Sequence, residues 1–142
     1  MNDINDVIYQ IPSLTFDQLS KEGAGLKKII LVVEKSKYST MESATLQLII
    51  KAIKLDFEKD IILLKIDDHE KVSLSSLIND YQDILIFGLS PSVLGFFIEY
   101  KAYHILQFEK KRMLVADSLQ ELNVSKSKKG LLWSTLQNMY QV

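Results

Sequence analysis

Short apolar runs along this chain alternate with stretches in which apolar and polar residues are mixed. Three of the runs are rich in Ile, Leu and Val, and each ends in polar residues. Consecutive apolar residues are typical of strands that are buried on both faces of a parallel sheet. The runs therefore predict strands near residues 28–33, 60–66 and 83–88.

The stretch between the first two runs has the spacing of an amphipathic helix. Its apolar residues recur every three or four positions, while Ser43 and Lys51 fall on the opposite side. Ser39 followed by Glu42 is a capping-box pattern, in which the two side chains satisfy backbone N–H groups at the start of a helix. The same spacing predicts a second helix over residues 72–81.

The C-terminal part of the chain predicts a hairpin and further helices. Two apolar runs joined by the polar residues 109–112 indicate a hairpin, or two strands that meet at the sheet edge, with a strand near 112–117. A short helix is expected near 92–100. Ser118 begins a second capping-box pattern, and residues 125–140 have the spacing of a final helix.

Strand and helix units in this order predict one α/β domain over residues 27–142, preceded by an arm and lead-in segment over residues 1–26. The expected architecture is a three-layer sandwich with a mostly parallel central sheet of four to five strands and helices on both faces. The expected core residues are Ile30, Val32, Leu48, Ile49, Ile53, Ile62, Leu64, Leu85, Phe87, Leu114, Leu132, Trp133 and Leu136.

Composition and charge narrow the class of protein. The 142 residues suit one domain, and 17 basic against 18 acidic side chains remove the usual electrostatic basis for tight, direct nucleic-acid binding. The absence of cysteine excludes disulfides and thiolate chemistry. The acidic start lacks the pattern of a secretory signal, and no apolar run is long enough to span a bilayer, so we expect a cytoplasmic protein without a membrane segment.

The loop after the third run is a candidate anion site. Gly88, Ser90, Ser92 and, after the late strand, Ser118 would lie at the carboxyl ends of parallel strands, where ligands bind in such sheets. A single glycine matches neither the Walker pattern nor the dinucleotide fingerprint. The favoured interpretation is structural, with Ser90 as a helix cap and Pro91 at the first helical position.

Other candidate chemistry is weaker. Residues 67–70 read Asp-Asp-His-Glu and have the groups for metal binding or acid–base work, but a solvated polar turn is the favoured interpretation. His104 is expected to be a hydrogen-bonded histidine of the core or sheet edge. Arg112 is the single arginine, although sites that bind phosphate or carboxylate commonly use this side chain.

The C-terminal sequence has an order of elements that resembles a known family. A strand with a small residue is followed by a Ser, a short Leu-containing helix and a helix marked by Leu-Trp. The residues concerned are Ala116, Ser118, Leu119, Leu122 and the pair Leu132-Trp133, together with the step Lys51-Ala52-Ile53 in the first half. This order resembles the psi subunit of the bacterial DNA polymerase III clamp loader, over residues 27–140.

The resemblance implies a non-catalytic adaptor that links the clamp loader to other replication proteins, with clamp-loader or single-strand-binding components as partners. The psi fold is similar to that of uracil-DNA glycosylases, which gives the alternative of a nucleotide- or DNA-binding domain with a degenerate site. Residues 34–40 and 116–121 take the places of the glycosylase catalytic loops and lack their motifs. We therefore expect no catalytic residues, cofactor or metal.

A partner surface is expected at apolar residues outside the periodic elements. Residues 1–16 are acidic, whereas the psi family has a basic arm that docks onto the ATPase subunits. With a net charge near zero, binding should rely on an apolar patch with a polar rim. The expected contact residues are Tyr9, Ile11, Leu14 and Phe16 in the arm, and Phe96 and Tyr100 in the aromatic segment.

Overall fold

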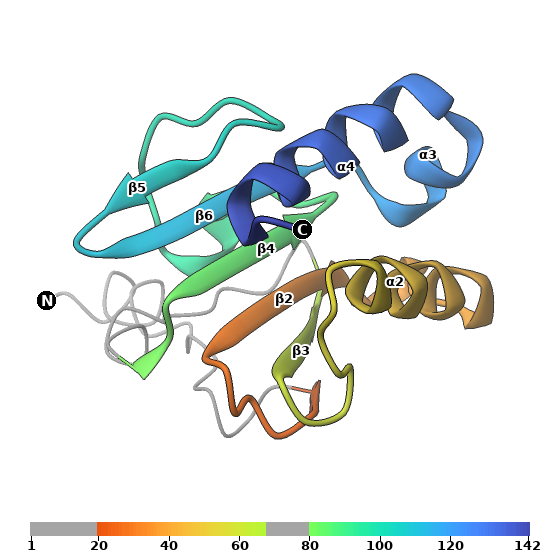
Figure 1. The fold of residues 1–142 in the computed structure, drawn as a ribbon, viewed down its shortest axis with the longest axis horizontal. Helices are drawn as coiled ribbons and strands as arrows, with labels where there is room; N and C mark the ends of the chain where they lie inside the picture. Colours follow the sequence, from red (N-terminus) through yellow and green to blue (C-terminus); the bar gives the residue numbers. More distant parts are fainter. Residues whose placement is uncertain (1–19, 68–79) are drawn as a thin grey trace, which may run out of the picture.

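A six-stranded mixed sheet forms the centre of the fold (Figure 1). The computed structural model describes residues 20–67 and 80–142. The strand order is β1-β3-β2-β4-β6-β5, in which the four middle strands are parallel and the two edge strands are antiparallel to their neighbours. The strands are β1 (Ser20–Glu22), β2 (Ile29–Glu34), β3 (Ile61–Ile66), β4 (Asp83–Phe87), β5 (Leu106–Phe108) and β6 (Lys111–Ala116).

The α/β prediction is therefore confirmed, and the four predicted strands are the four parallel ones. The predicted hairpin is also present, because β5 and β6 pair across a two-residue turn. Glu109 and Lys110 in this turn both have positive φ, as the tightest hairpin turns require. The edge strand β1 was not expected, since three residues of the sequence Ser-Lys-Glu carry no apolar pattern.

Three α-helices are present in the described residues, and all of them cover one face of the sheet (Figure 1). On β2, Ile29, Leu31 and Val33 face these helices, while Ile30 and Val32 face the other side. The helices are α2 (Thr40–Ala52), α3 (Leu119–Val124) and α4 (Lys126–Tyr140), and two short 3-10 helices are η2 (Lys35–Lys37) and η4 (Pro91–Leu94).

The expectation of helices on both faces is only partly matched. Among the described residues the second face is covered by η4 and by loop side chains such as Leu89 and Phe96. The helix expected near 92–100 ends after four residues because Gly95 adopts the left-handed conformation, with φ of 87°. The helix predicted over 72–81 falls outside the described residues except at its last two positions.

The prediction of a buried core position is wrong for two residues. The side chain of Leu48 is 68% exposed and that of Trp133 is 38% exposed. On α2 the buried positions are Glu42, Leu46 and Ile50, which recur every four residues on one face, beside the predicted face that contains Leu48 and Ile49. The sequence is ambiguous here because α2 has apolar residues on more than one face, so that its periodicity does not identify the buried side.

Candidate functional site: an apolar groove between two helices

The carboxyl ends of β4 and β6, where the sequence predicts the candidate anion site, are filled by the protein itself. Gly88 has φ of +78°, and a Cβ placed on it would lie 2.9 Å from the Cβ of Ser118. The N–H of Gly88 donates to the carbonyl of Ala116 at 3.0 Å. The cavity beside Phe87 and Ser118 measures only about 10 Å³, which is at most the space of one water molecule.

The serine hydroxyls of this edge serve local structure. Ser90 Oγ accepts a hydrogen bond from the N–H of Ser92 at 3.3 Å, and Pro91 is the first residue of η4, so the predicted cap is confirmed. Ser118 Oγ accepts from the N–H of Glu121 at 3.2 Å and caps α3. Of the four candidate anion-loop residues, the structure brings Gly88 and Ser118 into contact, while Ser90 and Ser92 hydrogen-bond to each other.

The single arginine holds α4 on the sheet. Arg112 donates from Nε and an Nη to the two carboxylate oxygens of buried Asp83, at 2.9 and 2.8 Å, and from its other Nη to the carbonyl of Met139 at 2.6 Å. The hydroxyl of Tyr140 donates to Asp83 at 2.7 Å. Burial and the adjacent carboxylate raise the pKa of Tyr140. Three of the five N–H groups of this guanidinium are therefore used within the fold.

A second polar cluster joins the end of β6 to the start of α4. Tyr103 donates its hydroxyl hydrogen to Asp117 at 2.5 Å. Burial, followed by this hydrogen bond, raises the pKa of Tyr103 to about 12, so the phenol stays protonated at neutral pH and is not a general base. Lys128 bridges Asp117 at 3.6 Å and Glu121 at 3.0 Å. This cluster therefore has a structural role, because it holds the start of α4 close to the end of β6.

The histidines and the acidic turn provide no assembled site within the described part of the chain. No three His, Cys, Asp or Glu side chains gather at metal-binding distance in residues 20–67 and 80–142. Asp67 accepts the N–H of Ser36 at 3.1 Å, and residues 68–70 lie outside the described residues. His104 is exposed in a turn, with Nδ1 3.1 Å from the carbonyl of Ala102, rather than in the core.

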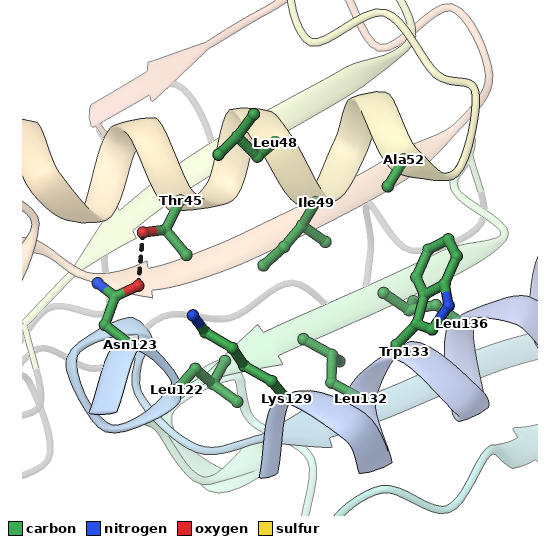
Figure 2. A pocket seen from close by; sticks show the side chains of 10 residues that line it. All are labelled: Thr45, Leu48, Ile49, Ala52, Leu122, Asn123, Lys129, Leu132, Trp133 and Leu136. Carbon is green, nitrogen blue, oxygen red and sulfur yellow. Dashed lines mark hydrogen bonds between the residues drawn. The ribbon is translucent and has the colours of Figure 1, made fainter. Parts of the chain in front are cut away.

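An open apolar groove lies between α2 and α4 (Figure 2). Its volume is about 330 Å³. α3 packs against both helices and closes one end. The lining residues, which define what we name the α2–α4 groove, are Thr45, Leu48, Ile49, Ala52, Leu122, Asn123, Lys129, Leu132, Trp133 and Leu136.

The two helices form this groove because each directs one stripe of side chains to the sheet and a neighbouring stripe to the gap. On α4, Leu132 and Leu136 are buried against the sheet, whereas Trp133 turns toward α2. On α2, Ile49 points into the gap (Figure 2), and Ala52 is too small to fill the space opposite the indole. The resulting surface is largely hydrocarbon with one aromatic ring.

The polar groups of the groove gather at the end formed by α3 (Figure 2). Thr45 Oγ1 donates to Asn123 Oδ1 at 2.7 Å, but the buried Nδ2 of Asn123 has no acceptor among the described residues. Lys129 extends from α4 into the same region and makes no ion pair with another described residue. The groove therefore combines apolar walls with one polar end that carries the positive charge of Lys129.

The expected partner residues are distributed differently. Tyr9, Ile11, Leu14 and Phe16 lie outside the described residues. Phe96 is half-buried and packs edge-on against Phe108, with ring centroids 5.8 Å apart. Tyr100 is exposed by 45%, and Phe97 in the same segment is exposed by 86%.

Sequence reasoning missed Leu48 and Trp133 as surface residues because it assigned both to the core. One feature of the sequence could have indicated them. The segments that form α2 and α4 have more large apolar residues than a single buried face of each helix can hold, so some of these residues must be exposed.

Comparison with known proteins does not assign the chain to a family. It matches no protein-family profile and no curated protein. Within residues 20–67 and 80–142, none of the helices has the length and apolar character needed to cross a bilayer. The geometry of the α2–α4 groove is therefore the observation on which a functional argument rests.

Proposed function

We propose that this chain is a non-catalytic protein–protein adaptor and that the α2–α4 groove is a partner-binding surface. The observation that carries the proposal is that two large apolar side chains, Leu48 and Trp133, are exposed and line the same apolar groove. Contiguous exposed apolar surface of this kind marks interaction sites, because a free monomer gains nothing from leaving it in water. Tryptophan is also among the residues that contribute most at interfaces.

The order of the C-terminal elements supports a psi-like adaptor. β6 ends at Ala116, Ser118 caps α3, and α4 carries the pair Leu132-Trp133. Leu132 is buried while Trp133 lines the groove, so the pair has one residue for packing and one for contact. We propose clamp-loader or single-strand-binding components as partners, in the cytoplasm, without tight direct contact to nucleic acid.

The glycosylase-type alternative has less support. It requires a ligand at the carboxyl ends of the strands, where Ser118 packs against Gly88 and the remaining cavity is about 10 Å³. Arg112, the side chain best suited to an anionic ligand, is held by Asp83. These features favour an adaptor over a degenerate enzyme.

Co-purification with a charge placed in the groove tests the proposal. Leu48→Glu puts a carboxylate among apolar walls and should remove the partner from an affinity purification of the tagged full chain. Met41→Glu is the matched control, because Met41 lies on the same helix with 67% exposure and is not part of the groove. If both variants recover the same proteins in the same amounts as the wild type, the groove is not a partner site and the proposal fails.

A further inference from the structure

We infer that the partner element seated in the α2–α4 groove is an amphipathic α-helix that carries an acidic residue beside its apolar stripe. This inference rests on the proposed function and specifies its partner. Three properties of the groove support it: its length, its apolar walls and the charge at one end.

The length and walls suit a helix. The groove is lined by residues 45–52 of α2 and 129–136 of α4, and eight residues of a helix correspond to about 12 Å at 1.5 Å per residue. A groove of that length accepts about two turns of a third helix, whose residues at i, i+3, i+4 and i+7 form one apolar stripe. Ile49, Ala52 and Trp133 are the side chains that such a stripe would contact.

The charge indicates that the helix is acidic. α4 carries Lys126, Lys128 and Lys129 and no acidic residue. Lys128 is engaged by Asp117 and Glu121, whereas Lys129 lines the groove without an ion pair to a described residue. A basic residue on the incoming helix would meet like charge here, while a carboxylate would be attracted.

A second copy of the chain does not supply these features. A symmetric pair would place the lysines of one α4 near those of the other, and α2 offers only the buried Glu42. Residues 1–19 of the chain, by contrast, contain three Asp and no Lys or Arg. Occupancy of the groove by this segment of the same chain is the competing outcome that the experiment must separate.

Trp133 is the only tryptophan, so its fluorescence reports directly on the groove. The probe is a synthetic 18-residue helical peptide with Leu at i, i+3, i+4 and i+7 and Glu at the flanking positions, compared with the same peptide carrying Lys for Glu. We expect the Glu peptide to shift Trp133 emission to shorter wavelength, to protect it from acrylamide and to bind at least about tenfold more tightly than the Lys peptide.

Matched variants assign the effect to named side chains. Leu48→Ala should weaken binding of the Glu peptide by about tenfold, with Met41→Ala unchanged. Lys129→Glu should remove the preference for the Glu peptide, whereas Lys126→Glu, on the same helix outside the groove, should preserve it. Melting temperatures equal to that of the wild type establish that the variants are folded.

Two results would overturn the inference. One is equal binding of the two peptides, or no change at Trp133 with either of them. The other is a shift of Trp133 emission to longer wavelength on deletion of residues 1–19, which would assign the groove to the chain's own N-terminal segment. If Leu48→Glu still abolishes co-purification while the Glu peptide fails to bind, the adaptor function stands and only the acidic helix is wrong.

Discussion

The hydroxyl of Tyr140 and the guanidinium of Arg112 share one buried carboxylate, that of Asp83. Hydrogen bonds to charged groups contribute about 1.5 to 3 kcal/mol when they are buried. We therefore expect Tyr140→Phe to lower the free energy of unfolding by about that amount in urea titrations. Tyr100→Phe, at an exposed tyrosine, should change it by less than about 0.5 kcal/mol. Equal effects of the two variants would refute a structural role for the shared carboxylate.

Glu42 gives the molecule an acid-sensitive helix start. Its carboxylate accepts hydrogen bonds from the side chain and, at 3.1 Å, from the N–H of Ser39. The side-chain hydrogen bond from Ser39 is the main reason that the pKa of Glu42 lies below its ordinary value, with burial acting in the opposite direction. Because the folded-state pKa is depressed, the resulting stabilisation is present above the unfolded-state pKa of about 4.3 and is lost as the pH falls through the folded-state pKa.

The lowered pKa of Glu42 predicts how the stability of the protein depends on pH. We expect Glu42→Gln to be less stable than the wild type at pH 7, and the difference between the two proteins to shrink as the pH is lowered below about 4. Glu99→Gln, at an exposed position, is the control and should follow the wild type at every pH. A Glu42→Gln difference that is independent of pH would mean that the ionised carboxylate is not the stabilising form.

At the scale of elements, α2 shows how two leucines on one helix have different roles. Leu46 is fully buried against the sheet, and Leu48 lines the open groove with 68% of its side chain exposed. Leu46→Ala should cost about 2 to 5 kcal/mol of unfolding free energy because it leaves a cavity in the core. Leu48→Ala should cost less than about 1 kcal/mol. Thermal and urea unfolding of the two variants compare them directly, and a loss at Leu48 as large as that at Leu46 would place Leu48 in the core.

The parallel strands were predictable because their apolar runs are a property of local sequence. β2, β3 and β4 are buried on both faces, so that all their positions except Glu34, Lys65 and Asp83 are apolar and each strand is visible without its neighbours. The edge strands were less visible. Ser20–Glu22 becomes a strand only because β3 supplies the pairing, and no residue pattern within the segment itself indicates this.

The groove was not predictable for a related reason. Its existence depends on how far apart α2 and α4 lie, which is set by their packing on the sheet and against α3. Trp133 follows the buried Leu132 directly, and the sequence does not indicate which of the two faces the sheet. The caps at Ser90 and Ser118 were predictable, because a cap depends on three or four consecutive residues.

At the scale of the whole molecule, the described fold begins with β1 at Ser20. Deleting residues 1–16 removes none of the described elements, so we expect the truncated protein to keep one cooperative thermal transition. If Tyr9 and Phe16 bind a partner, as expected from the sequence, the same deletion should abolish or weaken co-purification. Unfolding or aggregation of the truncated protein would instead assign the segment to the core, and unchanged recovery of the partner would exclude it as a contact.

The two short edge strands also restrict how this molecule meets other chains. A long, flat, apolar edge would present a row of free N–H and C=O groups on which a neighbouring chain could build further strands, the usual start of aggregation. Here the long apolar strands β3 and β6 are each covered by a three-residue strand, and at β1 the edge is charged, with Glu22 paired to Lys65 at 2.6 Å. Three residues offer too few backbone groups for stable strand addition. Within the described residues, the sheet edges therefore offer little backbone for templated growth, and the helical face offers side chains for recognition of another protein.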